Sequence, residues 1–286
     1  MTEPPFGSVA IVGLGLIGGS IALAIRENWP SMRVVGVDSQ SVAAHALGSG
    51  AIDRAVDSVA GLPATDLVIL AAPVQQNVAL LADVNARHAS IVTDVGGTKR
   101  SIVEAARALP DVTFVGGHPL GGGERGGFAF ARADLFRGRP WIFTPDVVGS
   151  GLSRPNAIDR LTSFATGLGA QPATMTPDDH DRLMAYVSHL PQLAASALME
   201  VVGSASTADG LRMAGKGLFD TTRLASSPAD VWRDICATNA DAIGPALDRL
   251  IERLTELRAD LDRGGAVQAV FEEAARWRAA LVKTRE

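Results

Sequence analysis

The stretch VAIVGLGLIGGS (residues 9–20) joins an apolar run to a helical pattern through Gly13, Gly15 and Gly18, which have the G-x-G-x-x-G spacing. In such a strand–turn–helix unit the first glycine permits a tight turn and the second lets a pyrophosphate approach the backbone. The third lets the helix pack closely on the strand. The free N–H groups at the start of the helix then face the phosphates. The stretch predicts a dinucleotide-binding unit; a glycine turn without a ligand is the alternative.

Asp38 ends the next apolar run and indicates which dinucleotide binds. Its carboxylate would accept hydrogen bonds from the ribose hydroxyls and repel a 2′-phosphate, which favours NAD over NADP. Further along, small residues and a proline follow the apolar run at 66–70. This segment is expected to contact the adenosine side of the cofactor, and a plain turn between strand and helix is the alternative. The residues expected to contact the cofactor are Gly13, Leu14, Gly15, Leu16, Ile17, Gly18, Asp38, Ala72, Pro73, Val74 and Asp94.

The first half of the chain alternates strand-like and helical patterns. Short apolar runs follow one another at residues 33–38, 66–72, 90–95, 112–117 and 140–145, with helical patterns such as 18–28 and 99–109 between several of them. Apolar strands spaced by helices are typical of a doubly wound, Rossmann-type parallel sheet covered on both faces. A further helix is expected at 155–168, and a further strand is expected within 170–177.

After Pro177 the sequence shows helical patterns only, at residues 178–203, 245–264 and 265–281. We therefore predict two domains: an NAD-binding domain at 1–177 and an all-helical substrate and dimerisation domain at 178–286. The leucine stripes of the second half are wide and need a partner surface. That surface is either the core of the domain itself or a dimer interface.

Composition narrows the function classes. The chain has 286 residues, 47% of them hydrophobic, a net charge of −5 and one cysteine, Cys236. No apolar run approaches the length of a membrane span, the N-terminus does not resemble a signal peptide, and the charge gives no reason to expect nucleic acid. A single cysteine suits a reducing cytoplasm, and Cys236 is expected to be a core thiol with no metal site around it.

The stretch GGHPLGGGERGG (residues 116–127) follows the fifth apolar run and places His118 at the carboxyl edge of the expected sheet. It occurs in order with the glycine turn, TDVGGTK (93–99), VSHLPQ (187–192) and VWRDI (231–235). Together these motifs resemble the prephenate/arogenate dehydrogenases of tyrosine biosynthesis over nearly the whole chain. The resemblance implies a cytoplasmic NAD-dependent homodimer that oxidises a cyclohexadienol and releases its ring carboxylate as carbon dioxide.

The resemblance also implies roles for individual residues. His118 would be the acid/base residue that takes the proton of the substrate's 4-hydroxyl, and a neutral imidazole suits this near pH 7. Arg233 would grip a substrate carboxylate, unless it forms a surface salt bridge with Asp230 or Asp234; Arg223 is a second candidate. The other residues expected in the substrate site are Thr98, Gly122, Glu124, His189 and Gln192.

His189 and Gln192 lie on a polar stripe of an apolar helix, which must meet polar partners or line a wet cavity. A buried core histidine is the alternative for His189. Glycines 121–123 would let the backbone pass close to a small ring, while Glu124 and Arg125 either gate the pocket or form a solvated pair.

Two positions differ from the family pattern. Gly97 replaces a serine that is common in relatives, and Gln192 replaces a second histidine. We predict that the substrate is prephenate, and arogenate or a 4-amino analogue of prephenate is the alternative that these two positions leave open. Two other classes of protein are alternatives: a β-hydroxyacid dehydrogenase that uses Lys216 as its acid/base, and a protein that binds NAD without turnover.

Overall fold

The computed structural model describes residues 3–85, 87–109, 111–123, 125–146 and 155–283. The chain divides into two compact units, Met1–Ala240 and Asp241–Glu286. This division lies downstream of the domain boundary predicted after Pro177, because the helices that follow the sheet hydrogen-bond to the elements around it. The division at residue 177 into an NAD-binding domain and a substrate and dimerisation domain stays a prediction.

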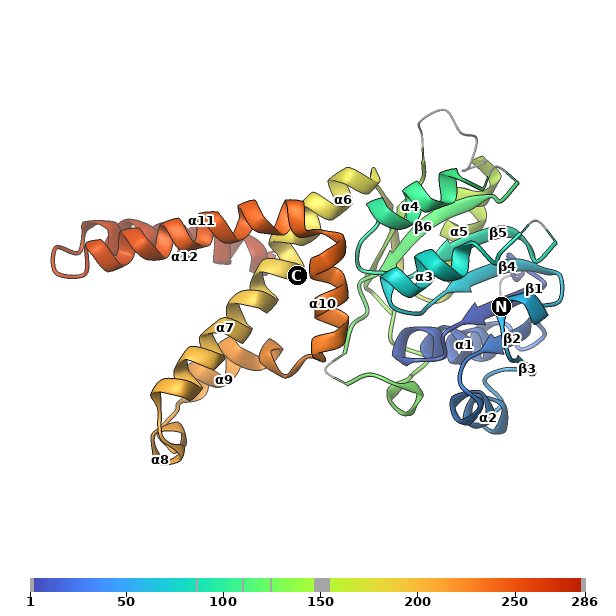
Figure 1. Ribbon diagram of the computed structural model, residues 1–286, viewed down its shortest axis with the longest axis horizontal. Helices are drawn as coiled ribbons and strands as arrows, with labels where there is room; N and C mark the ends of the chain where they lie inside the picture. Colours follow the sequence, from blue (N-terminus) through green and yellow to red (C-terminus); the bar gives the residue numbers. More distant parts are fainter. Residues whose placement is uncertain (1–2, 86, 110, 124, 147–154, 284–286) are drawn as a thin grey trace. The chain divides into compact units, whose positions relative to one another are not determined.

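The first unit holds an eight-stranded sheet with the strand order β3-β2-β1-β4-β5-β6-β7-β8 (Figure 1). The strands are β1 (Ser8–Val12), β2 (Arg33–Val37), β3 (Arg54–Val56), β4 (Thr65–Leu70), β5 (Ala89–Asp94), β6 (Phe114–Pro119), β7 (Pro140–Thr144) and β8 (Gln171–Thr174). In this order the neighbouring strands from β3 to β6 are parallel, as predicted for all of them except β3, which no apolar run indicated. The expected parallel direction is wrong at β7, which pairs antiparallel with β6. A parallel pair needs a crossover connection, and the described residues between β6 and β7 form only a loop with one short 3₁₀ turn.

Helices cover both faces of the sheet. They are α1 (Leu16–Asn28), α2 (Gln40–Gly48), α3 (Val74–Leu81), α4 (Arg100–Arg107) and α5 (Pro155–Gly167). Alternate residues of β1 enter two separate cores: Val9 and Ile11 pack with residues of α1 and α5, whereas Ala10 and Val12 pack with residues of α3 and α4. Side chains of a strand point to opposite faces in turn, so a sheet buried on both sides gives the continuous apolar runs seen in the sequence.

After β8 the described chain is helical, which confirms the prediction for the second half. The elements are α6 (Pro177–Met184), a π-helical turn (Ala185–His189), α7 (Leu190–Ala205), α8 (Ala208–Arg212), α9 (Lys216–Thr222), a 3₁₀ turn (Arg223–Ser226) and α10 (Ala229–Thr238). The hydroxyl of Thr176 accepts the N–H of Asp179 at 3.1 Å and caps α6. The π-helical turn ends two residues before Pro191, whose ring nitrogen cannot donate a hydrogen bond to the helical ladder.

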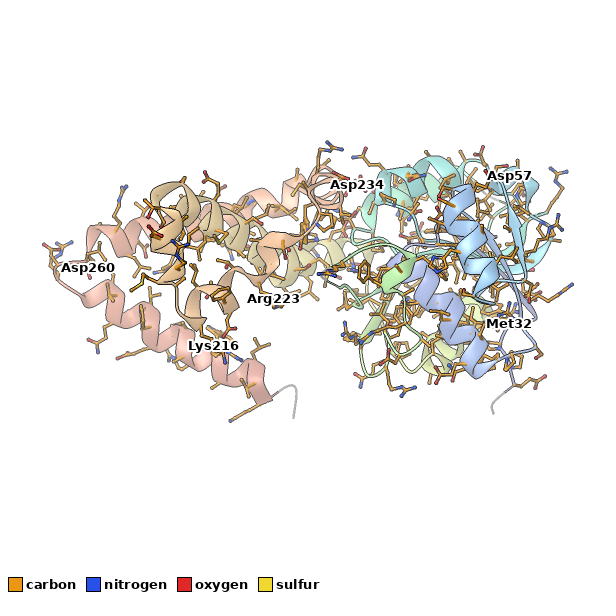
Figure 2. The ribbon with its side chains drawn as sticks, turned by 90° about the horizontal axis from the view of Figure 1, so that it is seen from below. Met32, Asp57, Lys216, Arg223, Asp234 and Asp260 are labelled. Atoms are coloured by element: carbon orange, nitrogen blue, oxygen red, sulfur yellow. The ribbon has the colours of Figure 1, made fainter. Side chains whose placement is uncertain are left out.

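The second unit contains α11 (Ala240–Ala259) and α12 (Gly265–Lys283). Asp260 lies in the turn between them (Figure 2), and its carboxylate accepts the N–H of Ala266 at 2.5 Å. Large apolar side chains of this unit are exposed, among them Ile251, Leu254, Leu261, Phe271 and Trp277. No helix in the described ranges is both long and apolar enough to cross a membrane.

Candidate active site

The glycine turn between β1 and α1 leaves no room for side chains at two positions. Gly13 has φ +97°, and a Cβ there would lie 2.7 Å from the carbonyl carbon of Ala71. A Cβ on Gly18 would lie 1.9 Å from the carbonyl oxygen of Gly13. A Cβ on Gly15 would meet nothing within 4 Å, so this side of the turn is open to a ligand. These three environments match the roles expected of the three glycines.

A cavity of about 530 Å³, here called the turn cavity, lies along the open side of this turn. Five of the residues expected to contact the cofactor line it: Gly13, Gly15, Asp38, Ala72 and Pro73. The carboxylate of Asp38 accepts the N–H of Leu14 at 2.6 Å and that of Ser39 at 2.7 Å, which holds it against the turn. Small residues, an open glycine and a fixed carboxylate fit the adenosine end of a dinucleotide.

The remaining residues of the cofactor prediction lie elsewhere. Leu14, Gly18 and Val74 are buried, and Leu16 and Ile17 line a different cavity. Asp94 is completely buried and pairs with the ammonium of Lys99, so its carboxylate is not on the wall of the turn cavity. A buried charge needs such a partner.

Lys99 and Asp94 instead tie β5 to β6. Asp94 accepts the N–H groups of Gly96 at 2.8 Å and Gly117 at 3.1 Å, while Lys99 Nζ donates to the carbonyl of Gly117 at 2.7 Å. These bonds fix the backbone immediately before His118.

His118 lies near the carboxyl end of β6, as predicted, and is half-buried. Its Nδ1 lies 2.8 Å from Nε2 of His180, and Nδ1 of His180 lies 2.8 Å from Oδ1 of Asp181. We call these three residues the triad. Among the described residues, Nε2 of His118 has no hydrogen-bond partner.

Burial keeps the triad's imidazoles neutral. Burial lowers the pKa of His118 well below 6.5, and the positive charge of the Lys99 ammonium acts in the same direction. Burial also lowers the pKa of His180, and it lowers that of His189 to about 4. A neutral imidazole with an unpaired nitrogen can accept a proton near pH 7.

A second cavity of about 660 Å³, the loop cavity, is lined by the start of α1, the glycine loop after β6, α7, the 3₁₀ turn at Arg223–Ser226 and α10. Its walls include Leu16, Ile17, Gly122, Gly123, Arg125, Gly126, Gln192, Arg223, Leu224, Ser227, Pro228, Val231 and Trp232. Gln192 Nε2 donates to the carbonyl of Leu224 at 2.7 Å, and its Oε1 accepts the hydroxyl of Ser227 at 3.1 Å. Gly122, Gln192 and Arg223 therefore line the same cavity.

Other predicted substrate residues lie away from this wall. Arg233 is exposed on α10, and the neighbouring Asp234 accepts the backbone N–H of Gln75 at 3.2 Å. His189 is buried, with Nδ1 3.2 Å from Nδ2 of Asn239. Thr98 is also buried.

The hydroxyl of Thr98 lies 2.8 Å from that of Thr238. Glu124 lies outside the described residues. Lys216 is exposed at the start of α9 (Figure 2). Cys236 is half-buried rather than a core thiol, and its burial raises its pKa.

The sequence reasoning missed His180, Asp181, Lys99 and Asn239. Asp181 accepts the backbone N–H groups of Lys99 at 2.8 Å and Arg100 at 2.9 Å, and Asn239 Nδ2 donates to the carbonyl of Asp181 at 2.9 Å. A clue was available, because the chain has only five histidines and one of them, His180, lies in α6. By itself this is a weak signal of function. No local pattern pairs His180 with His118, because their contact spans 62 residues.

Two family models match the chain: the prephenate dehydrogenase nucleotide-binding domain over residues 21–172 and the prephenate dehydrogenase dimerization domain over residues 176–271. The chain is 36% identical over 268 residues to a prephenate dehydrogenase of Bacillus subtilis, covering 91% of this chain and 71% of that protein. It is 32% identical to a cyclohexadienyl dehydrogenase of Zymomonas mobilis, covering 88% of each. The crystal structure of a prephenate dehydrogenase from A. aeolicus, in complex with hydroxyphenyl propionate and NAD+, is 26% identical with a TM-score of 0.82. That match covers 100% of this chain and 98% of the other.

Proposed function

The chain belongs to the prephenate dehydrogenase family and is an NAD-dependent oxidoreductase, and we propose that it oxidises and decarboxylates prephenate with His118 as the general base. One observation carries the assignment of His118. Its imidazole is held neutral at the carboxyl end of β6, with Nε2 unpaired among the described residues. Ligands of open α/β sheets bind at this edge.

The chemistry divides between cofactor and protein. NAD, when bound, supplies the acceptor for the hydride that leaves C4 of the substrate. Nε2 of His118 takes the proton of the 4-hydroxyl, and the ring carboxylate leaves as carbon dioxide while the ring becomes aromatic. The turn cavity, with Gly15 open and Asp38 fixed against Leu14, supports binding of the adenosine end of NAD.

An arginine is needed for the carboxylates of prephenate, because a guanidinium matches carboxylate geometry. The position of Arg223 on the wall of the loop cavity supports this role for Arg223. Arg233 stays the candidate that the family resemblance indicates. We assign Gly122 and Gln192 to the same wall, and we retain Thr98, His189 and Glu124 as proposed substrate-site residues.

Gly97 favours a second candidate function within the family: oxidation of a cyclohexadienol with a different substituent, such as arogenate or the 4-amino analogue. A Cβ at Gly97 would lie 3.5 Å from Ile235 and 4.0 Å from Nε2 of His118. The absent side chain therefore leaves room next to the proposed base. A different C4 substituent would have to be accommodated there.

The assembly is a further part of the proposal. The family model over 176–271 is that of a dimerization domain, and exposed side chains such as Phe271 and Trp277 on α12 give this region an apolar surface. These observations support a homodimer. The single cysteine supports a reducing, cytoplasmic location.

A side-by-side turnover assay tests the substrate. NADH or NADPH formation is followed with prephenate, arogenate and the 4-amino analogue at matched concentrations. We expect the highest kcat/KM for prephenate with NAD. A higher value for either other substrate would favour the second candidate, and binding of NAD without turnover of any of them would contradict both.

A further inference from the structure

We propose that His180 and Asp181 are positioning residues that hold the proton of the His118 ring on Nδ1, so that Nε2 faces the substrate as an unprotonated base. The inference rests on the proposed function of His118. It assigns a donor and an acceptor to each hydrogen bond of the triad: His118 donates to His180, and His180 donates to the Asp181 carboxylate.

The direction starts at Asp181, which is completely buried and surrounded by donors. Oδ1 accepts the backbone N–H of Lys99 at 2.8 Å, and Oδ2 accepts the backbone N–H and Nε of Arg100 at 2.9 Å and 3.2 Å. Burial alone would raise the pKa of Asp181. The hydrogen bonds from His180 and from these backbone groups outweigh burial and lower it. Asp181 is therefore an anion, and a carboxylate can only accept.

The same reasoning passes to the two rings. Since Asp181 only accepts, the proton between it and His180 sits on Nδ1 of His180. Burial lowers the pKa of His180, so this ring is neutral at pH 7, and its Nε2 carries a lone pair. The 2.8 Å contact between Nε2 of His180 and Nδ1 of His118 then requires the proton to be on His118. His118 is neutral as well, which leaves Nε2 as an acceptor.

The charged and titratable groups around the two rings are Asp94 on β5, Lys99 and Arg100 at the start of α4, Asp181 on α6 and His189 in the π-helical turn. The ammonium of Lys99 opposes a positive charge on either ring, and the Asp181 carboxylate favours a positive charge on His180. When Nε2 of His118 takes the substrate proton, the ring becomes a cation and still donates from Nδ1 to His180. The Asp181 carboxylate lies at the other end of the same hydrogen-bonded row. No proton has to leave the triad for the step to balance.

Without this arrangement the His118 ring would be free to carry its proton on either nitrogen. An Nε2–H tautomer would present a donor to the substrate hydroxyl, which has to lose a proton. The triad thus separates two roles: His118 performs the proton transfer, and His180 with Asp181 selects the form of His118 that can do it.

The first experiment reads the tautomer directly. Nitrogen NMR of the full protein labelled with ¹⁵N at histidine, with the His118 signals assigned by His118→Asn, reports which ring nitrogen carries the proton at pH 7. We expect Nδ1–H and an unprotonated Nε2. A proton on Nε2 would overturn the inference, even if the enzyme turns over prephenate and the proposed function therefore stands.

The second experiment changes the acceptor. His180→Phe keeps a ring in the core but removes the acceptor for Nδ1–H, whereas His180→Gln supplies an amide oxygen in its place. We expect kcat to fall by ~10²-fold or more in His180→Phe, because a His118 ring with its proton on Nε2 cannot act as the general base. We expect a smaller fall in His180→Gln and little change in the KM for NAD in either variant.

His88→Gln is the matched control. His88 is also buried and hydrogen-bonded through Nδ1, to the N–H of Asn85 at 3.3 Å, but it precedes β5 at the opposite edge of the sheet. It should leave kcat unchanged. Equal losses in His180→Phe and His180→Gln, with the His118 tautomer unaltered in both, would show that His180 only fills space and would overturn the inference.

Discussion

The glycine turn at residues 13–18 is made of main chain, whereas the triad of His118, His180 and Asp181 is made of side chains from two distant segments. The turn works because side chains are absent: a Cβ at Gly18 would lie 1.9 Å from a carbonyl oxygen. The role that we propose for the triad depends on side-chain geometry, with His118 and His180 in contact at 2.8 Å and His180 and Asp181 in contact at 2.8 Å. From this difference we expect substitutions in the turn to weaken NAD binding and lower stability. Substitutions in the triad should instead slow the chemical step.

His118→Asn should give the largest effect of the variants, and this effect should be on the rate of the chemical step. The variant loses the nitrogen that takes the proton, so we expect kcat with prephenate to fall by ~10²-fold or more. The KM for NAD should stay near the wild-type value because the turn is untouched. Steady-state kinetics with each substrate varied in turn measures both, and an unchanged kcat would remove His118 from the mechanism.

Gly18→Ala tests the glycine turn. The new Cβ would force the turn apart, so we expect the affinity for NAD to fall by at least about tenfold, through weakened hydrogen bonds to the phosphates. We also expect the free energy of unfolding to fall by about 1–3 kcal/mol. Isothermal titration calorimetry and thermal unfolding measure these effects.

Gly48→Ala is the control for that variant. Gly48 is the last residue of α2, and a Cβ there would meet nothing within 4 Å. It should leave NAD affinity unchanged. If both alanine variants behaved alike, the close packing at Gly18 would not matter for binding.

The two arginines sharpen the comparison at the substrate end. Arg223 lines the loop cavity and Arg233 does not, so Arg223→Ala should raise the KM for prephenate by about tenfold, the loss of one charged hydrogen bond. Arg233→Ala should raise it less, and neither should change the KM for NAD. A larger effect at Arg233 would instead favour the family-based assignment.

A pH experiment addresses the buried imidazoles. The pKa of His189 is lowered from 6.5 to about 4 in the folded protein, so below pH 6.5 the unfolded chain binds a proton that the folded chain does not. Its contribution to stability is therefore complete above pH 6.5 and is lost as the pH falls from about 6.5 to about 4. In His189→Gln the slope of unfolding free energy against pH in this window should decrease by up to ~1.4 kcal/mol per pH unit, the value for one proton. Denaturant unfolding at several pH values measures it, and an unchanged slope would show that His189 titrates normally.

Gly97→Ser should give the smallest effect. The added Cβ would lie 3.5 Å from Ile235, an ordinary contact, and would bring a hydroxyl near Nε2 of His118. We expect kcat to change by less than about tenfold, the scale of one neutral hydrogen bond. Gly96→Ser is the contrast, because its Cβ would lie 2.9 Å from the Asp94 carboxylate and should lower the melting temperature clearly. Similar melting temperatures for the two variants would contradict the difference in space.

Much of the fold followed from local pattern. The apolar runs predicted every strand of the sheet except β3 (Arg54–Val56), the helical second half is confirmed, and His118 lies at the end of β6 as expected. The direction of β7 was wrong, because strand direction depends on how the chain returns to the sheet and the apolar run at 140–145 is the same either way. Asp94 is predicted to contact the cofactor, and the structure buries its carboxylate against Lys99, five residues further along the chain. That spacing alone does not tell whether the pair faces a ligand or the interior.

The sequence by itself determined the nucleotide turn, because Gly13, Gly15, Gly18 and Asp38 act within one strand–turn–helix unit where spacing fixes geometry. It also identified His118 as the candidate base. Only the tertiary structure determined which residues hydrogen-bond to that base. His180 and Asp181 reach it when α6 lies against β6 and the start of α4, and hydrogen bonds between side chains need distances and directions that sequence separation does not specify.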